Sequence, residues 1–208
     1  INLNVLKNNE LSKSRDMKNY WIRLLNVFIG KFGMQRTSDV MIHLICGPIG
    51  AGKTTLAHSL AKKYNAIRFS EDEWLSHLYV ADAPEGLMQQ PAEAIAEWAA
   101  TRYQRCRVQI DLLIRPLLAQ GISVVLDGAA ANKEQRDLIR QKALNYQVGF
   151  QLYYVDANSE CRKERVFQRN IDRGETYAIE VNEGMFDLME VFFQAPIGEE
   201  LKGITKYI

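Results

Sequence analysis

The sequence predicts a three-layer α/β/α fold, in which helices cover both faces of a parallel β-sheet. Three observations support this class. Short apolar runs alternate with helical patterns along the chain, the first run leads through a glycine-rich turn into a helix, and 208 residues suffice for one such domain. Right-handed crossovers would then bring the carboxyl ends of the strands to one edge, where ligands bind in such sheets.

The first unit is a strand at 40–46, a glycine-rich turn at 47–54 and a helix from 55 onward. A second strand follows at 66–70, and Ser70 with Glu73 forms a capping box that starts another helix. A loop at 80–91, rich in proline and glycine, precedes the next long helix.

That long helix is expected at 92–119, where Pro116 and Gly121 mark its end. The remaining elements are a buried strand at 122–128, a helix from Asn132 to 146, a strand at 150–156, and a basic helix that Ser159 caps and that reaches Arg173. A loop at 174–182, a helix at 183–194 and a terminal strand at 204–208 complete the chain.

Composition places the chain among ordinary globular proteins, because 47% of its residues are hydrophobic and 25% are charged. A net charge of +1 argues against a dedicated nucleic-acid binder. The three cysteines are odd in number and lack metal-ligand spacing, which indicates reduced thiols. No apolar run approaches the roughly 20 residues of a membrane span, so we expect a cytoplasmic protein that does not engage a membrane.

Residues 1–38 are interpreted as an N-terminal extension before a domain at 39–208. A helical pattern from Met17 to Phe32 places large apolar side chains on one side. An amphipathic helix packed on the domain, or an upstream extension, is favoured over a membrane-binding helix because charges are interspersed.

The turn at 47–54 matches the phosphate-binding pattern G-x-x-x-x-G-K-S/T, in the strand and helix context that the pattern requires. Its glycines let backbone N–H groups approach phosphate oxygens at a helix N-terminus. The candidate nucleotide-binding residues are Gly47, Pro48, Ile49, Gly50, Ala51, Gly52, Lys53, Thr54 and Thr55. The pattern predicts that the chain binds a nucleoside triphosphate with magnesium.

Two further roles follow from this prediction. Lys53 is suited to the β- and γ-phosphates, and the Thr54 hydroxyl to Mg²⁺. Asp127 ends an apolar strand and is a second candidate magnesium ligand, although an acid in that position also caps turns. ATP and Mg²⁺ are therefore the expected cofactors.

Phosphoryl transfer also needs a carboxylate that accepts the proton of the acceptor hydroxyl. Glu71, Asp72 and Glu73 follow the second strand, and Asp72 is the chosen candidate because Glu73 fits the capping box. The alternative is that all three acids only complement the helix dipole.

The basic helix carries arginines at four-residue spacing, so Arg165, Arg169 and Arg173 share one face. Such cations stabilise the charge that spreads over a transferring phosphoryl group, and Arg165 and Arg169 are the candidates. A solvated basic face is the alternative. Arg136 is interpreted either as an acceptor contact or as a surface ion pair.

Taken together, these residues resemble the small P-loop kinases of the zeta-toxin, chloramphenicol phosphotransferase and polynucleotide kinase type, a group of AAA-family ATP-binding proteins. The resemblance spans about 41–200 and adds to the loop the segments Phe69-Ser70-Glu71-Asp72-Glu73, Val124-Val125-Leu126-Asp127-Gly128 with Arg136, Arg165-Val166-Phe167-Gln168-Arg169-Asn170, and Phe186-Asp187 with 192–196. It implies a P-loop NTPase fold, nucleoside-kinase-like with a helical lid. It also implies that Asp72 activates the acceptor, and that Arg165 and Arg169 belong to the lid.

Three functions remain open at this point. The leading hypothesis is an ATP- and magnesium-dependent phosphotransferase that modifies a hydroxyl of a small molecule or nucleotide. The alternatives are a 5′-hydroxyl polynucleotide kinase, which the near-neutral charge disfavours, and an ATP-binding regulatory module without an acceptor. Two departures, Trp74 after the acidic cluster and Gln194-Ala195 near the end, leave the acceptor open.

Overall fold

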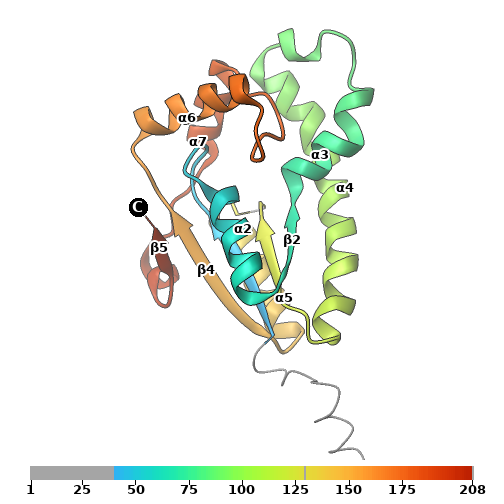
Figure 1. Cartoon of the computed structure of the whole chain (residues 1–208), viewed down its shortest axis with the longest axis vertical. Helices are drawn as coiled ribbons and strands as arrows, with labels where there is room; N and C mark the ends of the chain where they lie inside the picture. Colours follow the sequence, from blue (N-terminus) through green and yellow to red (C-terminus); the bar gives the residue numbers. More distant parts are fainter. Residues whose placement is uncertain (1–39, 129, 208) are drawn as a thin grey trace, which may run out of the picture. The chain divides into compact units, whose positions relative to one another are not determined.

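The computed structural model describes residues 40–128 and 130–207, so the helix expected at 17–32 lies outside the described residues. Within the described part, five parallel strands form one sheet in the order β2-β3-β1-β4-β5 (Figure 1). The strands are β1 (Met41–Cys46), β2 (Ile67–Ser70), β3 (Val124–Asp127), β4 (Gly149–Val155) and β5 (Thr205–Tyr207). The predicted parallel α/β sheet is confirmed.

Six α-helices accompany the sheet in the described residues. They are α2 (Lys53–Tyr64), α3 (Glu71–Tyr79), α4 (Ala92–Ala119), α5 (Lys133–Asn145), α6 (Ser159–Asp172) and α7 (Glu183–Phe192). Short 3₁₀ turns lie at Val80–Asp82, Leu87–Gln89 and Gly198–Leu201. Among the described residues, no helix has both the length and the apolar character needed to cross a membrane.

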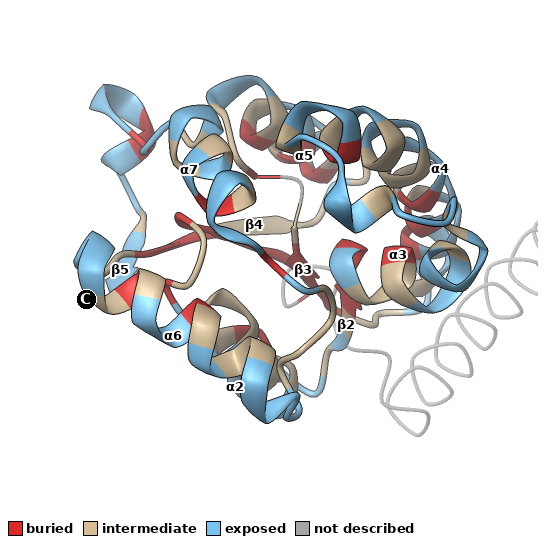
Figure 2. Ribbon diagram, turned by 90° about the horizontal axis from the view of Figure 1, so that it is seen from above, coloured by how far each residue is buried: buried red, intermediate tan, exposed pale blue. Residues whose placement is uncertain are grey.

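Two hydrophobic clusters fill the space between the layers. On one face of the sheet, Ile110 and Ile114 of α4 and Ile139 of α5 pack with strand residues such as Leu126. On the other face, side chains of α2 pack against β1 and β3. Figure 2 shows α4 and α5 on one side of the strands and α2 on the other, which confirms the three layers.

The register of the strands sets the edge where the functional residues gather. Asp127, the last residue of β3, pairs with Ile45 of β1 on one side and with Ser70 of β2 on the other. The glycine-rich loop leaves β1 at this edge, and α3 begins here directly after Ser70. Three segments that are separate in the sequence therefore meet at one edge, as the topology rule predicts.

Two of the three predicted helix N-caps are present in the structure, and one is not. The Ser70 hydroxyl accepts the Glu73 amide at 3.3 Å, and the Asn132 side chain accepts the Gln135 amide at 2.9 Å. The predicted cap at Ser159 is wrong, because Asn158 is the N-cap and its side chain accepts the Glu160 amide at 2.8 Å. An Asn one residue earlier provides a strong cap, and the Ser159 hydroxyl donates to Glu190 instead.

The three cysteines are free, and Cys46 and Cys106 are buried. Burial raises the pKa of the Cys46 thiol to about 12, so this side chain stays protonated and packs as a small apolar group.

Candidate functional site

The glycine-rich loop between β1 and α2 has a backbone that only glycine fits at its centre. Gly50 adopts φ +74°, and a Cβ at this position would lie 2.5 Å from the backbone oxygen of Arg162. Gly52 is the N-cap of α2 with φ +103°, and a Cβ there would meet nothing within 4 Å. No side chain caps α2, so its first N–H groups are available to an anion.

Lys53 is the first residue of α2 and lies over the loop. Its Nζ donates a hydrogen bond to the backbone oxygen of Pro48 at 2.8 Å. Burial lowers the pKa of the Lys53 ammonium, while the negative charges of Asp127 and Asp72 act in the opposite direction. Both carboxylates therefore lie near this ammonium, as the predicted site requires.

Asp127 is buried at the end of β3, next to the loop. Its Oδ2 accepts a hydrogen bond from Arg68 Nη1 at 2.9 Å. Burial and the charge of Asp72 raise the pKa of the Asp127 carboxyl, whereas the positive charges of Arg68 and Lys53 and the nearby Thr54 hydroxyl lower it. Thr54 and Asp127 are thus neighbours, the arrangement expected of two groups that share a metal ion.

Arg68 was not identified from the sequence. It lies in β2 beside Val125, and it forms an ion pair with Glu73 as well as with Asp127. The sequence feature that could have identified Arg68 is a charged residue inside a short strand, because an arginine that is largely buried in a sheet needs carboxylate partners.

The three acids at the start of α3 have different partners. Glu71 is buried, and both of its carboxylate oxygens accept from Arg107 Nε, at 2.9 and 3.1 Å. Glu73 is held by Arg68. Asp72 is exposed, and its Oδ1 accepts from the hydroxyl of Tyr103 on α4 at 2.6 Å. Asp72 is therefore the most exposed acid of this cluster, and its partner is a neutral hydroxyl.

Tyr103 was also not identified from the sequence. Burial is the main reason that its pKa is raised well above 10, and the Asp72 carboxylate adds to the effect. The phenol is therefore a stable hydrogen-bond donor to Asp72. The sequence carried no signal for this contact, because the two residues are 31 positions apart on different helices.

The two predicted arginines of α6 differ in exposure in the structure. Arg169 is partly buried, and its Nε is a buried donor with no hydrogen-bond partner among the described residues. Its charge lowers the pKa of Lys53, so it lies on the side of the phosphate loop. Arg165 is exposed and lines, with Arg169, a hollow at the end of α6.

A third arginine of this helix, Arg162, is structural. Its Nε donates to Ala157 O at 2.9 Å, its Nη1 donates to Ile49 O at 3.0 Å, and both terminal nitrogens bind Glu190. The glycine-rich loop is therefore attached to α6 and α7 through one guanidinium. Glu190 raises the pKa of Arg162 further, so the attachment stays charged.

Both interpretations of Arg136 are wrong. The side chain is 0% exposed, so it meets neither solvent nor an acceptor. It donates to Glu200 at 2.7 and 2.9 Å and to the backbone oxygens of Gln194 and Ala130 at 2.8 and 3.2 Å. It joins α5 to the loop after β3 and to the C-terminal segment.

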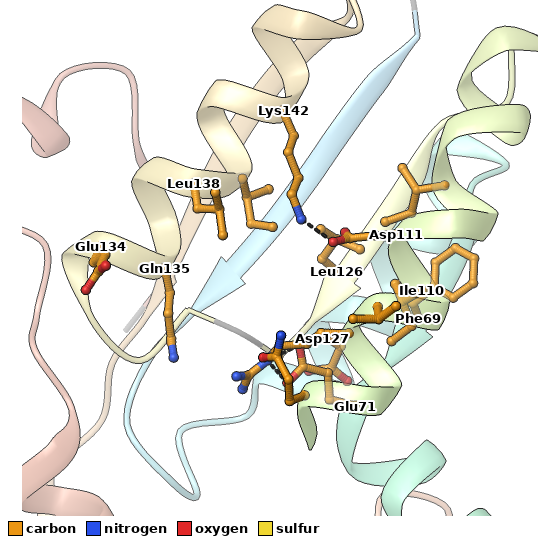
Figure 3. Close-up of a pocket in the computed structure, with 16 residues that line it drawn as sticks. Phe69, Glu71, Ile110, Asp111, Leu126, Asp127, Glu134, Gln135, Leu138 and Lys142 are labelled. Carbon is orange, nitrogen blue, oxygen red and sulfur yellow. Dashed lines mark hydrogen bonds and ion pairs between the residues drawn. The ribbon is translucent and has the colours of Figure 1, made fainter. Parts of the chain in front are cut away.

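A pocket of about 260 Å³ adjoins this edge of the sheet between α4 and α5 (Figure 3). Glu71 and Asp127 lie together at one end of it, and Leu138 and Gln135 of α5 lie along one side. Sequence reasoning did not predict this pocket, because its walls come from helices that only the tertiary fold brings together.

No group of three or more His, Cys, Asp or Glu side chains with metal-binding geometry occurs in the described part of the chain.

Comparison with known proteins assigns the family and the fold. The model of the AAA domain family (AAA_33) matches residues 42–196, so the chain belongs to this family. No curated protein sequence shows a significant match.

Three solved structures share the fold at low identity. A candidate kinase from Chloroflexus aurantiacus is 13% identical with a TM-score of 0.61, over 81% of this chain and 88% of its own. Kti12 from Chaetomium thermophilum, solved with ADP-AlF3, is 16% identical with a TM-score of 0.54, over 80% and 88%. A chain of the Pnkp1/Rnl/Hen1 RNA repair complex is 12% identical with a TM-score of 0.56, over 76% of this chain and 45% of its own.

Proposed function

We propose that this member of the AAA domain family is a phosphotransferase that moves the γ-phosphoryl group of ATP to a hydroxyl of a small acceptor, with Mg²⁺ as cofactor. The observation that carries the proposal is the meeting of the phosphate loop, Lys53, Asp127 and Asp72 at one edge of the sheet. We also propose, from the three free cysteines, that the enzyme works in the reducing cytoplasm.

ATP fits the residues present. The open N–H groups at the start of α2 and the unpartnered Nε of Arg169 are the donors that a triphosphate needs. Lys53 would leave the Pro48 carbonyl and bind the β- and γ-phosphates. Thr54 and Asp127 would hold Mg²⁺, because Arg68 takes Oδ2 of Asp127 and leaves Oδ1 free for a ligand.

In this proposal Asp72 acts as the general base. Asp72 lies in the first turn of α3, directly after the end of β2 at the edge of the sheet where the phosphate loop begins, so an acceptor placed at Asp72 would lie on the side of the phosphates. Tyr103 orients the carboxylate through Oδ1, which leaves Oδ2 to accept the proton of the acceptor. Bound Mg²⁺ would neutralise charge on the phosphates, and Arg169 would donate to the transferring group.

The test is transfer of label from γ-labelled ATP with Mg²⁺ to a panel of acceptors. The panel contains nucleosides, 5′-hydroxyl oligonucleotides, nucleotide sugars, aminoglycosides and chloramphenicol-like alcohols, so that it also separates the zeta-toxin, chloramphenicol phosphotransferase and polynucleotide kinase types. We expect label on one class of acceptor. Lys53→Met should slow transfer by roughly a thousandfold, as loss of a transition-state donor does elsewhere.

Asp72→Asn is compared with Asp82→Asn, which changes an exposed acid in the turn after α3. Asp72→Asn should abolish transfer while ATP still binds, and Asp82→Asn should leave transfer unchanged. Transfer that survives in Asp72→Asn would show that another group is the base. Label found only in free phosphate with every acceptor would instead favour an ATP-driven regulatory module.

A further inference from the structure

The pocket between α4 and α5 has apolar walls. Phe69 and Leu126 come from the strands, Ile110 comes from α4, and Leu138 comes from α5 (Figure 3). Its volume of about 260 Å³ lies just below the range of about 300 to 1,000 Å³ that is usual for ligand pockets. The pocket therefore suits a small compound with an apolar body.

Part of this apolar lining is open to water. Val108 of α4 is 51% exposed and Leu138 of α5 is 57% exposed, on opposite sides of the opening. A ligand that covered both side chains would remove apolar surface from water, which favours binding.

The charges of the lining restrict what binds. The lining contains four carboxylates, Glu71, Asp111, Asp127 and Glu134, but only two cations. Both cations are already in ion pairs, Arg107 with Glu71 and Lys142 with Asp111, and Figure 3 shows the second pair. Arg68, which lies outside the lining, pairs with Asp127, so the excess negative charge within the described lining is that of Glu134. An anionic ligand would meet this charge and no free cation there, whereas a neutral or cationic one would not.

The pocket reaches the proposed catalytic edge at one end. Gly128 borders it there, and a Cβ on this residue would lie 3.1 Å from the side chain of Glu71, so the backbone passes close to the carboxylate. Asp127 lines the pocket and pairs in register with Ile45 of β1, the strand that leads into the phosphate loop. One end of the pocket therefore lies at the edge of the sheet where the phosphate loop begins.

We propose that this pocket binds the acceptor, and that the acceptor is a small neutral or cationic alcohol with an aliphatic or aromatic body. The inference rests on the proposed function for the reaction itself. In that reaction the alcohol oxygen forms a bond to the γ-phosphorus, the bond from this phosphorus to the β,γ-bridging oxygen breaks, ADP leaves with the electron pair, and the alcohol proton passes to Asp72.

Three probes that share one benzylic alcohol test the charge rule. They are 1-phenylethane-1,2-diol, which is neutral, 2-amino-1-phenylethanol, which is cationic, and mandelate, which is anionic. Methyl NMR of the full chain reads their binding at Ile110 and Leu138, with Leu60 on the opposite face of the sheet as an internal control. We expect the diol and the amino alcohol to shift the pocket methyls, and mandelate at the same concentration to leave them unchanged.

Two tryptophan variants of α5 test the location. Leu138→Trp fills the opening, whereas Leu144→Trp changes a leucine of similar exposure that does not line the pocket. With Ile110 as the reporter, Leu138→Trp should weaken binding of the diol at least tenfold, and Leu144→Trp should not weaken it. Both variants should bind ATP as the unmodified chain does, because the phosphate loop is unchanged.

The proposal is overturned if no probe shifts the pocket methyls, if mandelate shifts them as strongly as the other probes, or if Leu138→Trp leaves binding unchanged. These readouts measure binding and do not require phosphoryl transfer. Pocket binding without label transfer to any alcohol would therefore count against the proposed function alone, and label transfer that Leu138→Trp does not impair would count against the pocket alone.

Discussion

The ion pair between Arg136 and Glu200 allows a sharp prediction about stability. Both side chains are almost completely removed from water, with 0% and 4% exposed. Glu200→Ala would leave the guanidinium buried without a counter-charge, while its two bonds to backbone oxygens hold it in place. Breaking a buried pair from one side costs about 3–5 kcal/mol. At about 2–4 °C per kcal/mol for a chain of this size, Tm should fall by roughly 6–20 °C.

Urea denaturation followed by circular dichroism measures the loss. Glu199→Ala is the matched control, because this neighbouring carboxylate is 85% exposed in its surface pair with Lys202. The double variant Arg136→Met/Glu200→Leu contains no buried charge, so it should be more stable than Glu200→Ala alone.

The same pair predicts a pH dependence. The hydrogen bonds from Arg136 lower the pKa of Glu200 below its ordinary 4.5. The stability that the ionised carboxylate contributes is complete above pH 4.5 and is lost as pH falls through the lowered value. The difference in unfolding free energy between the unmodified chain and Glu200→Ala should therefore shrink in acid.

Two results would refute this reasoning. One is a loss below about 1 kcal/mol for Glu200→Ala at pH 7, which would mean that water reaches the guanidinium. The other is a gap between the unmodified chain and Glu200→Ala that widens as pH falls.

Three further predictions concern the loop, the base and the arginines of the site. Gly50→Ala should abolish ATP binding, whereas Gly86→Ala, at nearly the same positive φ but with no atom closer than 3.8 Å, should cost only the backbone strain of about 1–2 kcal/mol; calorimetry and thermal unfolding measure the two effects. Tyr103→Phe should lower kcat about tenfold with KM for ATP unchanged, because one hydrogen bond to a charged group is lost. Arg169→Ala should lower kcat by a hundredfold or so. Arg173→Ala should change little, since that arginine is exposed and pairs with Glu180.

Each variant has an outcome that contradicts its premise. Equal effects of the two glycine variants would mean that contact with α6 does not constrain the loop. If Tyr103→Phe changes KM for ATP and leaves kcat unchanged, the tyrosine does not contribute to activation of the acceptor. Equal losses in the two arginine variants would indicate a general basic face, the alternative that the sequence left open.

The strand pattern and the phosphate loop were predictable from the sequence because both depend on local rules. Apolar runs of four to seven residues specify buried strands. The loop needs glycine at positions that its own backbone geometry fixes, as the φ of +74° at Gly50 illustrates. The helix at 92–119 was also predicted with the bounds that the structure shows, because Pro91 precedes its start and Gly121 follows its end.

Local rules did not predict the hydrogen bonds and ion pairs that side chains form with partners on other elements. The sequence gives no reason to distinguish the three adjacent acids, Glu71, Asp72 and Glu73. In the structure each has a different partner, which is Arg107, Tyr103 and Arg68, respectively. Partners of this kind lie 5 to 36 positions away, so no spacing rule identifies them.

The sequence by itself determined the three-layer class, the phosphate loop and the edge of the sheet at which strand-end acids meet, because parallel strands place their carboxyl ends together. Only the tertiary structure decided which acid remains accessible, that Arg136 is buried against Glu200, and that α4 and α5 enclose a pocket beside Asp127. These features depend on contacts between elements that are far apart in the chain, where burial and charge pairing, not local propensity, determine each side chain's role.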